Sequence, residues 1–178
     1  MTFLGNLLVT GTSTGVGKTT ALHLDRLGFR VFASVRKESD ADALRAEASG
    51  QLTPVLLDVT EPGSIFQAQQ EINSAVGDAG LLGIVNNAGI VFMSPLEFPS
   101  VDDVRRLFDV NVFGTLAVTQ AFLPLVRQAR GRIVNVSSAA SLFTLPFHGA
   151  YSASKLAVDG FSAADEADVG DGGLWACV

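Results

Sequence analysis

The chain has 178 residues, and its content of 48% hydrophobic and 17% charged residues indicates one globular domain rather than a disordered protein. Its net charge of −6 and isoelectric point near 4.7 argue against nucleic acid or an anionic membrane surface as the main partner. A single cysteine, two distant histidines, no signal peptide and no apolar run near the ~18 residues of a membrane span lead us to expect a cytoplasmic protein without metal, disulfide or membrane span.

Short apolar segments alternate along the chain with segments of helical periodicity. We predict a strand that ends in a glycine turn at 7–11, strands at 30–35, 52–59 and 131–138, and a strand and loop at 81–89. We predict helices at 17–27, 40–48, 62–76, 101–127 and 150–164. Buried strands that alternate with helices are typical of a parallel sheet with right-handed crossovers. We therefore predict an α/β fold, with one domain over residues 1–164 built on a doubly wound parallel sheet.

The segment 11–20, GTSTGVGKTT, follows the first predicted strand and fits two kinds of nucleotide-binding loop. Its end, Gly17-Lys18-Thr19, is similar to the phosphate loop of an ATPase, although Gly11 stands one residue too early for the usual spacing. In that interpretation Asp58, at the end of a later strand, would bind the metal ion of a nucleoside triphosphate.

The same glycines also suit a dinucleotide-binding turn between a strand and a helix. Gly11 would allow the tight turn, Gly15 would let the backbone approach a pyrophosphate, and Gly17 would let the helix pack closely on the strand. The start of the helix would then face the pyrophosphate, and Lys18 would be an ordinary first-turn residue. The segment alone leaves both interpretations open.

A tyrosine and a lysine one helical turn apart open the last predicted helix, in the sequence YSASK. This spacing places the phenol of Tyr151 and the ammonium of Lys155 on one helical face. A free phenol has a pKa near ~10, and a nearby cation favours the phenolate. The pair can therefore serve as a proton-transfer device, although an exposed tyrosine and lysine give the same pattern.

Two further polar features fall where the carboxyl edge of the predicted sheet is expected, and a third lies within a predicted helix. Ser138 ends the fifth strand and Asn86-Asn87-Ala88-Gly89 ends the fourth, and open parallel sheets bind ligands at this edge. Asn111 interrupts the apolar helix 101–127, where a buried amide needs hydrogen-bonding partners. A structural amide and a functional one are both compatible with that position.

Together the motifs TGTSTGVG, NNAG, Asn111, Ser138 and YSASK resemble the short-chain dehydrogenase/reductase family, in the family's order and spacing, over residues 5 to about 162. The resemblance implies a Rossmann-like sheet with strand order 3-2-1-4-5, an NAD(P) cofactor, and an alcohol or ketone substrate that is a small molecule. A phosphate-loop ATPase has no use for the later motifs and becomes a remote alternative.

The resemblance also assigns roles to single residues. Tyr151 would be the general acid–base residue, Ser138 would hold the substrate oxygen, and Lys155 would favour the phenolate and bind the nicotinamide ribose. Asn111 would anchor a water molecule in a proton relay. The cofactor-binding residues that the resemblance implies are Gly11, Thr12, Ser13, Thr14, Gly15, Val16, Gly17, Arg36, Asp58, Val59, Asn87, Ala88, Gly89, Tyr151 and Lys155.

The second predicted strand ends in Arg36 and Lys37 rather than in an acid. A carboxylate at this place holds the ribose 2′-hydroxyl of NAD and would repel a 2′-phosphate, whereas Arg36 can pair with a phosphate bidentately. We therefore expect NADP rather than NAD, although a solvated loop also accounts for two basic residues. The segments expected near the pocket mouth suggest an apolar substrate, and their apolar residues are Val91, Phe92, Met93, Leu142, Phe143, Leu145, Pro146 and Phe147.

The C-terminal segment departs from the family. After Phe161 the sequence becomes acidic and rich in glycine, and we set 165–178 apart as an atypical tail. Members of the family continue with two more strands and a loop that covers the cofactor, and without them we expect the strand 131–138 to form an open edge and turnover to be weak or absent. The tail segment LWACV is a candidate to pair along that edge. A non-catalytic nucleotide-binding module is the alternative function, and a homo-oligomer is possible.

Overall fold

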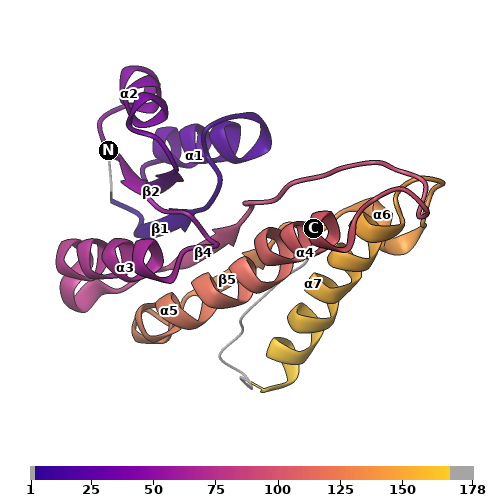
Figure 1. Ribbon diagram of the computed structural model, residues 1–178. Coiled ribbons are helices and arrows are strands. Elements are labelled where there is room, and N and C mark those ends of the chain that lie inside the picture. The colour runs from indigo at the N-terminus through magenta and orange to yellow at the C-terminus, as the bar shows by residue number, and fades with distance from the viewer. Residues whose placement is uncertain (1–2, 169–178) are drawn as a thin grey trace.

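The computed structural model describes residues 3–168, which form a five-stranded parallel sheet flanked by helices (Figure 1). The strands are β1 (Asn6–Val9), β2 (Arg30–Val35), β3 (Leu52–Leu56), β4 (Gly83–Asn86) and β5 (Arg132–Asn135). Their order in the sheet is β3-β2-β1-β4-β5, which confirms the predicted topology. The suggested pairing of LWACV lies outside the described residues.

Helices cover both faces of the sheet, because each strand buries residues in both directions. Leu8 and Phe32 belong to the core under α3 (Pro62–Val76) and α5 (Thr115–Gln128). Their neighbours Val9 and Val31 belong to the second core, under α1 (Gly15–Leu27) and α2 (Glu38–Glu47). This two-sided burial explains why the strands appear in the sequence as continuous apolar runs.

The long helix predicted at 101–127 consists of three parts. α4 (Val101–Phe108) begins with a capping box between Ser100 and Asp103, and α5 ends the run. Between them the segment η2 (Asp109–Gly114) forms a π-helical turn that contains Asn111. Such turns are rare and frequently occur at functional sites.

By length and composition alone, the run Val101–Gln128 is apolar enough to cross a membrane. From the sequence we had expected no membrane span. In this fold the run also supplies core residues. Leu107, Val118 and Phe122 are fully buried, and the last two pack in the core beneath the sheet. Burial against the sheet therefore accounts for much of its apolar character.

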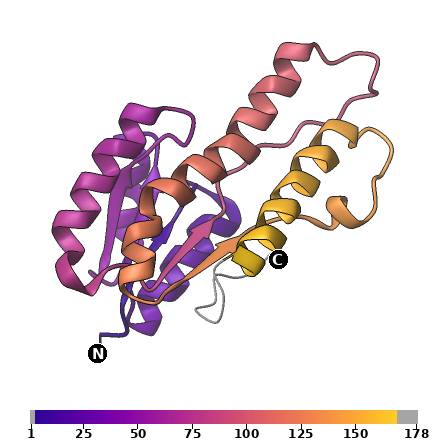
Figure 2. The same cartoon turned by 90° about the horizontal axis from the view of Figure 1, so that it is seen from below.

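The last helix, α7 (Gly149–Asp168), begins where it was predicted and continues into the segment set apart as a tail. The first turns of α7 extend beyond the carboxyl ends of the strands. So do α4, the short helix α6 (Ala139–Leu142) and the loops 90–99 and 143–148. Figures 1 and 2 show this set projecting to one side of the sheet, and we call it the arm. The remainder is the body.

Candidate active site

The turn after β1 packs directly against the backbone that follows β4. Gly11 has φ +68°, and a β-carbon placed on it would come within 2.7 Å of the Cα of Ala88. A β-carbon on Gly17 would collide with the side-chain amide of Asn87 and with the carbonyl of Gly11. The two glycines are therefore required by close approach, which agrees with their predicted roles.

Hydrogen bonds hold the two segments in register. The backbone NH groups of Asn87 and Ala88 both donate to Thr10 Oγ1 at 3.0 Å, and Asn87 Nδ2 donates to the carbonyl oxygens of Thr10 and Gly11 at 2.9 and 3.1 Å. Thr12 is fully buried and donates from its hydroxyl to the carbonyl of Ser34 at 2.9 Å. Thr12 thus fixes the turn to β2. The sequence analysis did not identify Thr10, whose hydroxyl organises the junction.

The first turn of α1 offers an anion site. Thr14 at its N-cap makes no side-chain capping bond, and the first turn holds no acidic residue. The leading NH groups of a helix have no partners within the helix, and together with the helix dipole they favour a negative group. Ser13, Thr14 and Val16 face the same cavity, so this end of α1 is free to receive a phosphate group.

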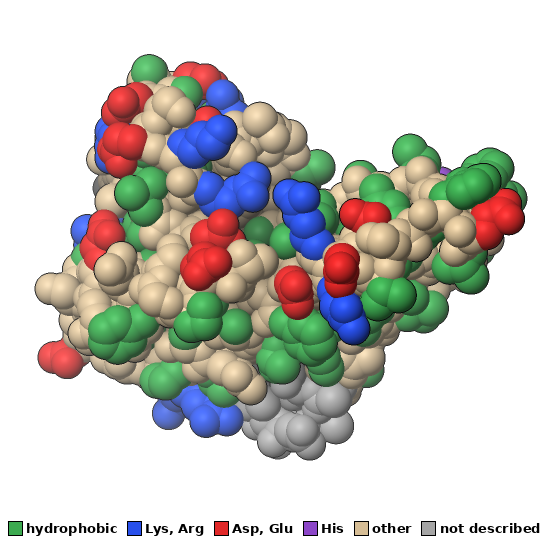
Figure 3. Space-filling model, viewed as in Figure 1, with side chains coloured by type: hydrophobic (Ala, Val, Ile, Leu, Met, Phe, Trp, Pro, Cys, Tyr) green, Lys and Arg blue, Asp and Glu red, His purple; other side chains and the backbone are tan. Residues whose placement is uncertain are grey.

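A cavity of about 870 Å³ opens between the body and the arm, where Figure 3 shows a hollow. Its walls come from the glycine turn, the ends of β2, β3 and β4, and one face of the helical run from α4 to α5. Of the residues implied by the resemblance, those lining it are Gly11, Ser13, Thr14, Val16, Gly17, Arg36, Asp58, Val59, Asn87, Ala88 and Gly89. Thr12, Gly15, Tyr151 and Lys155 do not line it. The shape and lining fit an extended dinucleotide, with a phosphate site at α1.

Asp58 and Arg36 lie at the ends of β3 and β2 in this cavity. Partial burial opposes ionisation of Asp58. However, hydrogen bonds from the NH and hydroxyl of Thr60 at 2.9 and 2.7 Å, helped by the charge of Arg36, outweigh it and hold the pKa of Asp58 below its ordinary value. Asp58 is therefore a carboxylate at neutral pH, able to accept a further hydrogen bond.

Lys18, which suggested a phosphate loop, does not line the cavity. Its ammonium lies 2.7 Å from Glu47 Oε1 at the end of α2, while the hydroxyl of Thr19 donates to the carbonyl of Gly15 within α1. In the described structure both side chains of the GKT sequence are engaged in structural contacts. This arrangement favours the dinucleotide interpretation over the phosphate-loop one.

Lys155 lies at the junction of the arm with the cavity. It is buried, and its Nζ donates to the carbonyl of Val136 at 2.7 Å and lies 6.0 Å from the centre of the half-buried Tyr151 ring. A β-carbon placed on Gly89, a residue of the cavity wall, would lie 3.7 Å from this Nζ. The structure thus brings the predicted Tyr151–Lys155 pair next to the cofactor cavity.

Asn111 joins the same junction from η2. Its Oδ1 accepts from the NH of Ile90 at 2.8 Å, and its Nδ2 donates to the carbonyl of Ile90 at 2.9 Å and to Ser154 Oγ at 3.1 Å. The hydroxyl of Ser154 in turn donates to the carbonyl of Tyr151 at 2.7 Å. Asn111 is therefore a satisfied buried amide, and these bonds couple the loop after β4 to the helix that carries Tyr151 and Lys155.

Ser138 lies at the start of α6, after β5. Its Oγ accepts from the NH of Ala140 at 3.1 Å, and its carbonyl accepts from the hydroxyl of Ser141 at 2.8 Å. The serine is partly exposed, and α6 packs against α7. Ser138 and Tyr151 therefore belong to adjacent helices at the base of the arm.

The sequence analysis missed the helical wall of the cavity, formed by Arg106, Asp109, Val110, Phe113, Gly114 and Ala117. Several of these recur at intervals of three or four residues, which is the one signal in the sequence that could have placed them on a common face. Only the packing of that face against β3 shows that it belongs to the site.

Comparison with protein families extends these observations. The family model described as short chain dehydrogenase matches residues 6–174, so the similarity continues past Phe161, where the sequence analysis placed its end. A bovine (Bos taurus) protein named dehydrogenase/reductase SDR family member 9 is 45% identical over 157 residues, which are 88% of this chain and 49% of that protein. Human retinol dehydrogenase 5 is 40% identical over 169 residues, which are 94% of this chain and 53% of that protein.

A third relative, mouse estradiol 17-beta-dehydrogenase 2, is 43% identical over 160 residues, which are 88% of this chain and 42% of that protein. The chain spans about half the length of these curated relatives. Among solved structures, a short-chain dehydrogenase from Streptomyces avermitilis matches with a TM-score of 0.89 and 30% identity, over 96% of this chain and 62% of that one. An alcohol dehydrogenase from Thermococcus sibiricus shares the fold, with a TM-score of 0.85 and 23% identity. The match covers 94% of this chain and 72% of that one.

Proposed function

Since this chain belongs to the short-chain dehydrogenase family, we propose that it is an NADP-dependent oxidoreductase that interconverts an apolar secondary or primary alcohol and its carbonyl form. The observation that carries the proposal is the junction at Gly89. There a β-carbon placed on Gly89, in the wall of a dinucleotide-sized cavity, would lie 3.7 Å from Nζ of Lys155, on the helix that also carries Tyr151. Cofactor site and proton-transfer pair are thereby parts of one site.

The residues that line the cavity would bind and orient the cofactor. The uncapped start of α1 would hold the pyrophosphate of a bound cofactor, and Asp58 and Val59 would lie beside its adenine. Arg36 supplies a guanidinium at the end of β2, where an NAD-binding protein has an acid, and this supports NADP as the preferred cofactor. When bound, the nicotinamide supplies or accepts the hydride.

The residues at the base of the arm carry out the proton transfer. Tyr151 gives a proton to the carbonyl oxygen of the substrate, or takes it from the alcohol, and Ser138 donates a hydrogen bond to the same oxygen. Lys155 places a positive charge near the phenol, 6.0 Å from its ring centre, and so favours the phenolate. Asn111 fixes α7 relative to the loop after β4, which keeps Tyr151 in place.

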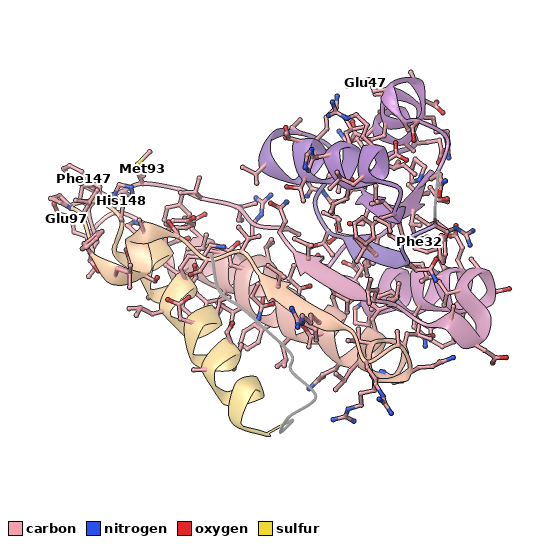
Figure 4. The ribbon with its side chains drawn as sticks, turned by 180° about the vertical axis from the view of Figure 1, so that it is seen from behind. Phe32, Glu47, Met93, Glu97, Phe147 and His148 are labelled. Carbon is pink, nitrogen blue, oxygen red and sulfur yellow. The ribbon has the colours of Figure 1, made fainter. Side chains whose placement is uncertain are left out.

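The exposed apolar side chains of the arm favour an apolar substrate over a polar one. The two loops of the arm, 90–99 and 143–148, are joined by a hydrogen bond from the NH of Ser94 to the carbonyl of Phe147 at 2.9 Å. Figure 4 shows Met93 and Phe147 at the far end of the arm, and both are exposed. The neighbouring exposed apolar residues are Val91, Leu96, Phe98, Leu142, Phe143 and Leu145. The names of two relatives, a retinol and an estradiol dehydrogenase, agree with a lipophilic alcohol.

Binding without turnover is the second candidate. Ser138 and Tyr151 do not line the cavity, so the residues that bind the dinucleotide are separable from those that act on the substrate. This alternative shares the cofactor site and differs only in chemistry.

One experiment separates the two candidates. The purified chain is incubated with NADP⁺ and retinol or estradiol, and NADPH formation is followed by absorbance, with Tyr151→Phe as the control. Any turnover by the parent chain should fall at least a hundredfold in the variant. Tight NADPH binding with no turnover of either alcohol, or of the matching carbonyl compounds, would leave the binding module as the better description.

A further inference from the structure

One face of the run from α4 into α5 forms a wall of the cavity. Arg106, Val110, Phe113 and Ala117 recur every three or four residues and all line it. Gly114 fixes this wall against the end of β3, because a β-carbon on it would come within 2.7 Å of Val59 Cγ2. The apolar members suit the face of an aromatic ring such as adenine. Arg106, one turn before Val110, adds a positive charge at the rim.

Arg106 and Arg36 bring two positive charges to the same cavity from different walls. Arg36 follows β2 in the body, and Arg106 belongs to α4 in the arm. Figure 3 shows basic side chains on both sides of the hollow between body and arm. Within residues 3–168, no acid lies within ion-pair distance of either cavity arginine, although the charge of Arg106 adds to the hydrogen bonds from Ser100 that lower the pKa of Asp103. Two guanidinium groups that line one cavity can both donate charge-assisted hydrogen bonds to an anion bound within their reach.

The acids of the cavity do not neutralise the two arginines by direct contact. Asp58 accepts hydrogen bonds from Thr60. Arg36 acts on it only through its charge, because the two side chains are too far apart for an ion pair. Glu61 and Asp109 also line the cavity, so its lining has three acids against two arginines. An anion is therefore favoured only within reach of the guanidinium groups, which makes the site selective for position as well as for charge.

We propose that Arg106 is a second specificity residue for the phosphorylated cofactor, and that it binds the 2′-phosphate of NADP together with Arg36. The inference rests on the proposed function, because it places a dinucleotide in the cavity. The pyrophosphate would occupy the start of α1, which leaves the 2′-phosphate as the remaining anionic group of the cofactor. Its three terminal oxygens are enough to accept hydrogen bonds from both arginines.

The test is a titration of the full chain with NADPH and with NADH, followed by cofactor fluorescence. The variants are Arg106→Gln, Arg36→Gln and, as the matched control, Arg105→Gln. Arg105 adjoins Arg106 on α4 but is exposed and paired with Asp102 at 2.8 Å, outside the cavity. Glutamine keeps a polar side chain with a high helix propensity, so the folding of α4 is little affected.

We expect Arg106→Gln to raise the Kd for NADPH roughly tenfold and the Kd for NADH less than about twofold, because it removes a charge-assisted contact to a phosphate that NADH lacks. Arg105→Gln should leave both values within about twofold, since its ion pair is at the surface. Arg36→Gln should also lower the preference for NADPH. Raising the salt concentration should weaken NADPH binding less in the Arg106 variant than in the parent chain.

Three results would overturn the inference. If Arg106→Gln behaves like Arg105→Gln while Arg36→Gln abolishes the preference, the 2′-phosphate is held by Arg36 alone and the proposed function stands. Equal weakening of NADPH and NADH by Arg106→Gln would mean that Arg106 contacts a part common to both cofactors. If the parent chain binds neither cofactor, the proposed function fails, and the inference fails with it.

Discussion

The body side of the cavity and the far end of the arm are built on different principles. The cavity walls are tied together by short hydrogen bonds and close backbone contacts, such as those joining Thr10, Gly11 and Gly17 to Asn87 and Ala88. The arm ends in two loops whose large apolar side chains are mostly exposed, including Leu96 at 79% and Leu142 at 78%. Its described connections to the body are concentrated at its base, through Asn111 and Lys155.

This contrast suggests a division of labour. A site whose walls are fixed by the sheet can bind a cofactor in a defined position, whereas exposed loops can adapt to the shape of a substrate or a covering segment. Binding and turnover should therefore respond differently to substitution. Changes at the base of the arm should affect chemistry, and changes in the glycine turn should affect binding and stability together.

Replacing Tyr151 with phenylalanine should give the largest effect and the sharpest separation of the two regions. The change removes the hydroxyl that exchanges the proton, so kcat should fall by roughly 10²–10⁴-fold, the usual contribution of a general acid–base group. NADPH affinity should stay within about twofold, because Tyr151 does not line the cavity. Steady-state kinetics and a fluorescence titration on the same preparation provide both values, and a parallel loss of binding would contradict the division.

Gly17→Ala should damage the cofactor site and the fold together. The added methyl would collide with Asn87 and with the carbonyl of Gly11, and overpacking of this kind costs about 1–3 kcal/mol of unfolding free energy. NADPH binding should weaken at the same time. Gly160→Ala on α7 is the control, because nothing lies within 4 Å of its added methyl, and helix propensity predicts a gain of up to ~1 kcal/mol. Urea unfolding measures both, and equal stabilities of the two variants would argue against a close-packed turn.

Asp58→Asn should produce a smaller effect that depends on pH. The pKa of Asp58 is lower in the folded chain than in the unfolded chain, so the ionised carboxylate stabilises the fold above the unfolded pKa of ~3.9, and this stabilisation is lost as the pH falls through the lower folded value. Solvent screening of this half-exposed group limits the gain to less than ~1 kcal/mol.

The measurement is urea unfolding of the parent chain and the asparagine variant between about pH 3 and 7. The parent chain should be the more stable at neutral pH, and the difference should disappear toward the acidic end. Asp78→Asn, at an exposed turn after α3, serves as the control. A difference that grows toward low pH would contradict the assignment.

Lys18→Ala should have the smallest effect. The substitution removes a surface ion pair with Glu47, worth about 0.2–1 kcal/mol, on a side chain that does not face the cavity. NADPH binding should change less than about twofold, and magnesium-dependent ATP binding should be absent before and after the change. Selective loss of ATP binding in this variant would restore the phosphate-loop interpretation.

The sequence was informative about elements and about the glycine turn because both depend on local patterns. The five strands are apolar runs bounded by glycine or polar residues, and the helix 62–76 was placed correctly from its periodicity. The predicted strand 52–59 extended too far, since β3 ends at Leu56. Leu57 and Val59 pack in the core after the strand has ended and also line the cavity, and an apolar run does not distinguish such residues from a strand.

Features that depend on tertiary packing were not predictable. The π-helical turn at 109–114 does not change the composition of the helix, so the segment 101–127 was predicted as one continuous helix. Likewise Arg106 looks like any other charge on an amphipathic helix until Gly114 is seen to pack on Val59. Asn111 was singled out, but only the contacts to Ile90 and Ser154 show that it couples the cofactor cavity to the arm.

The central claim is that the cofactor cavity and the base of the arm form one continuous site. Hydrogen–deuterium exchange of the full chain with and without NADPH tests it most directly. We expect slower exchange in three segments: the turn 11–17, the loop 87–91 and the start of α7 around Lys155. Protection confined to the turn, or no protection at saturating NADPH, would contradict the claim, because the junction at Gly89 would then not respond to the cofactor.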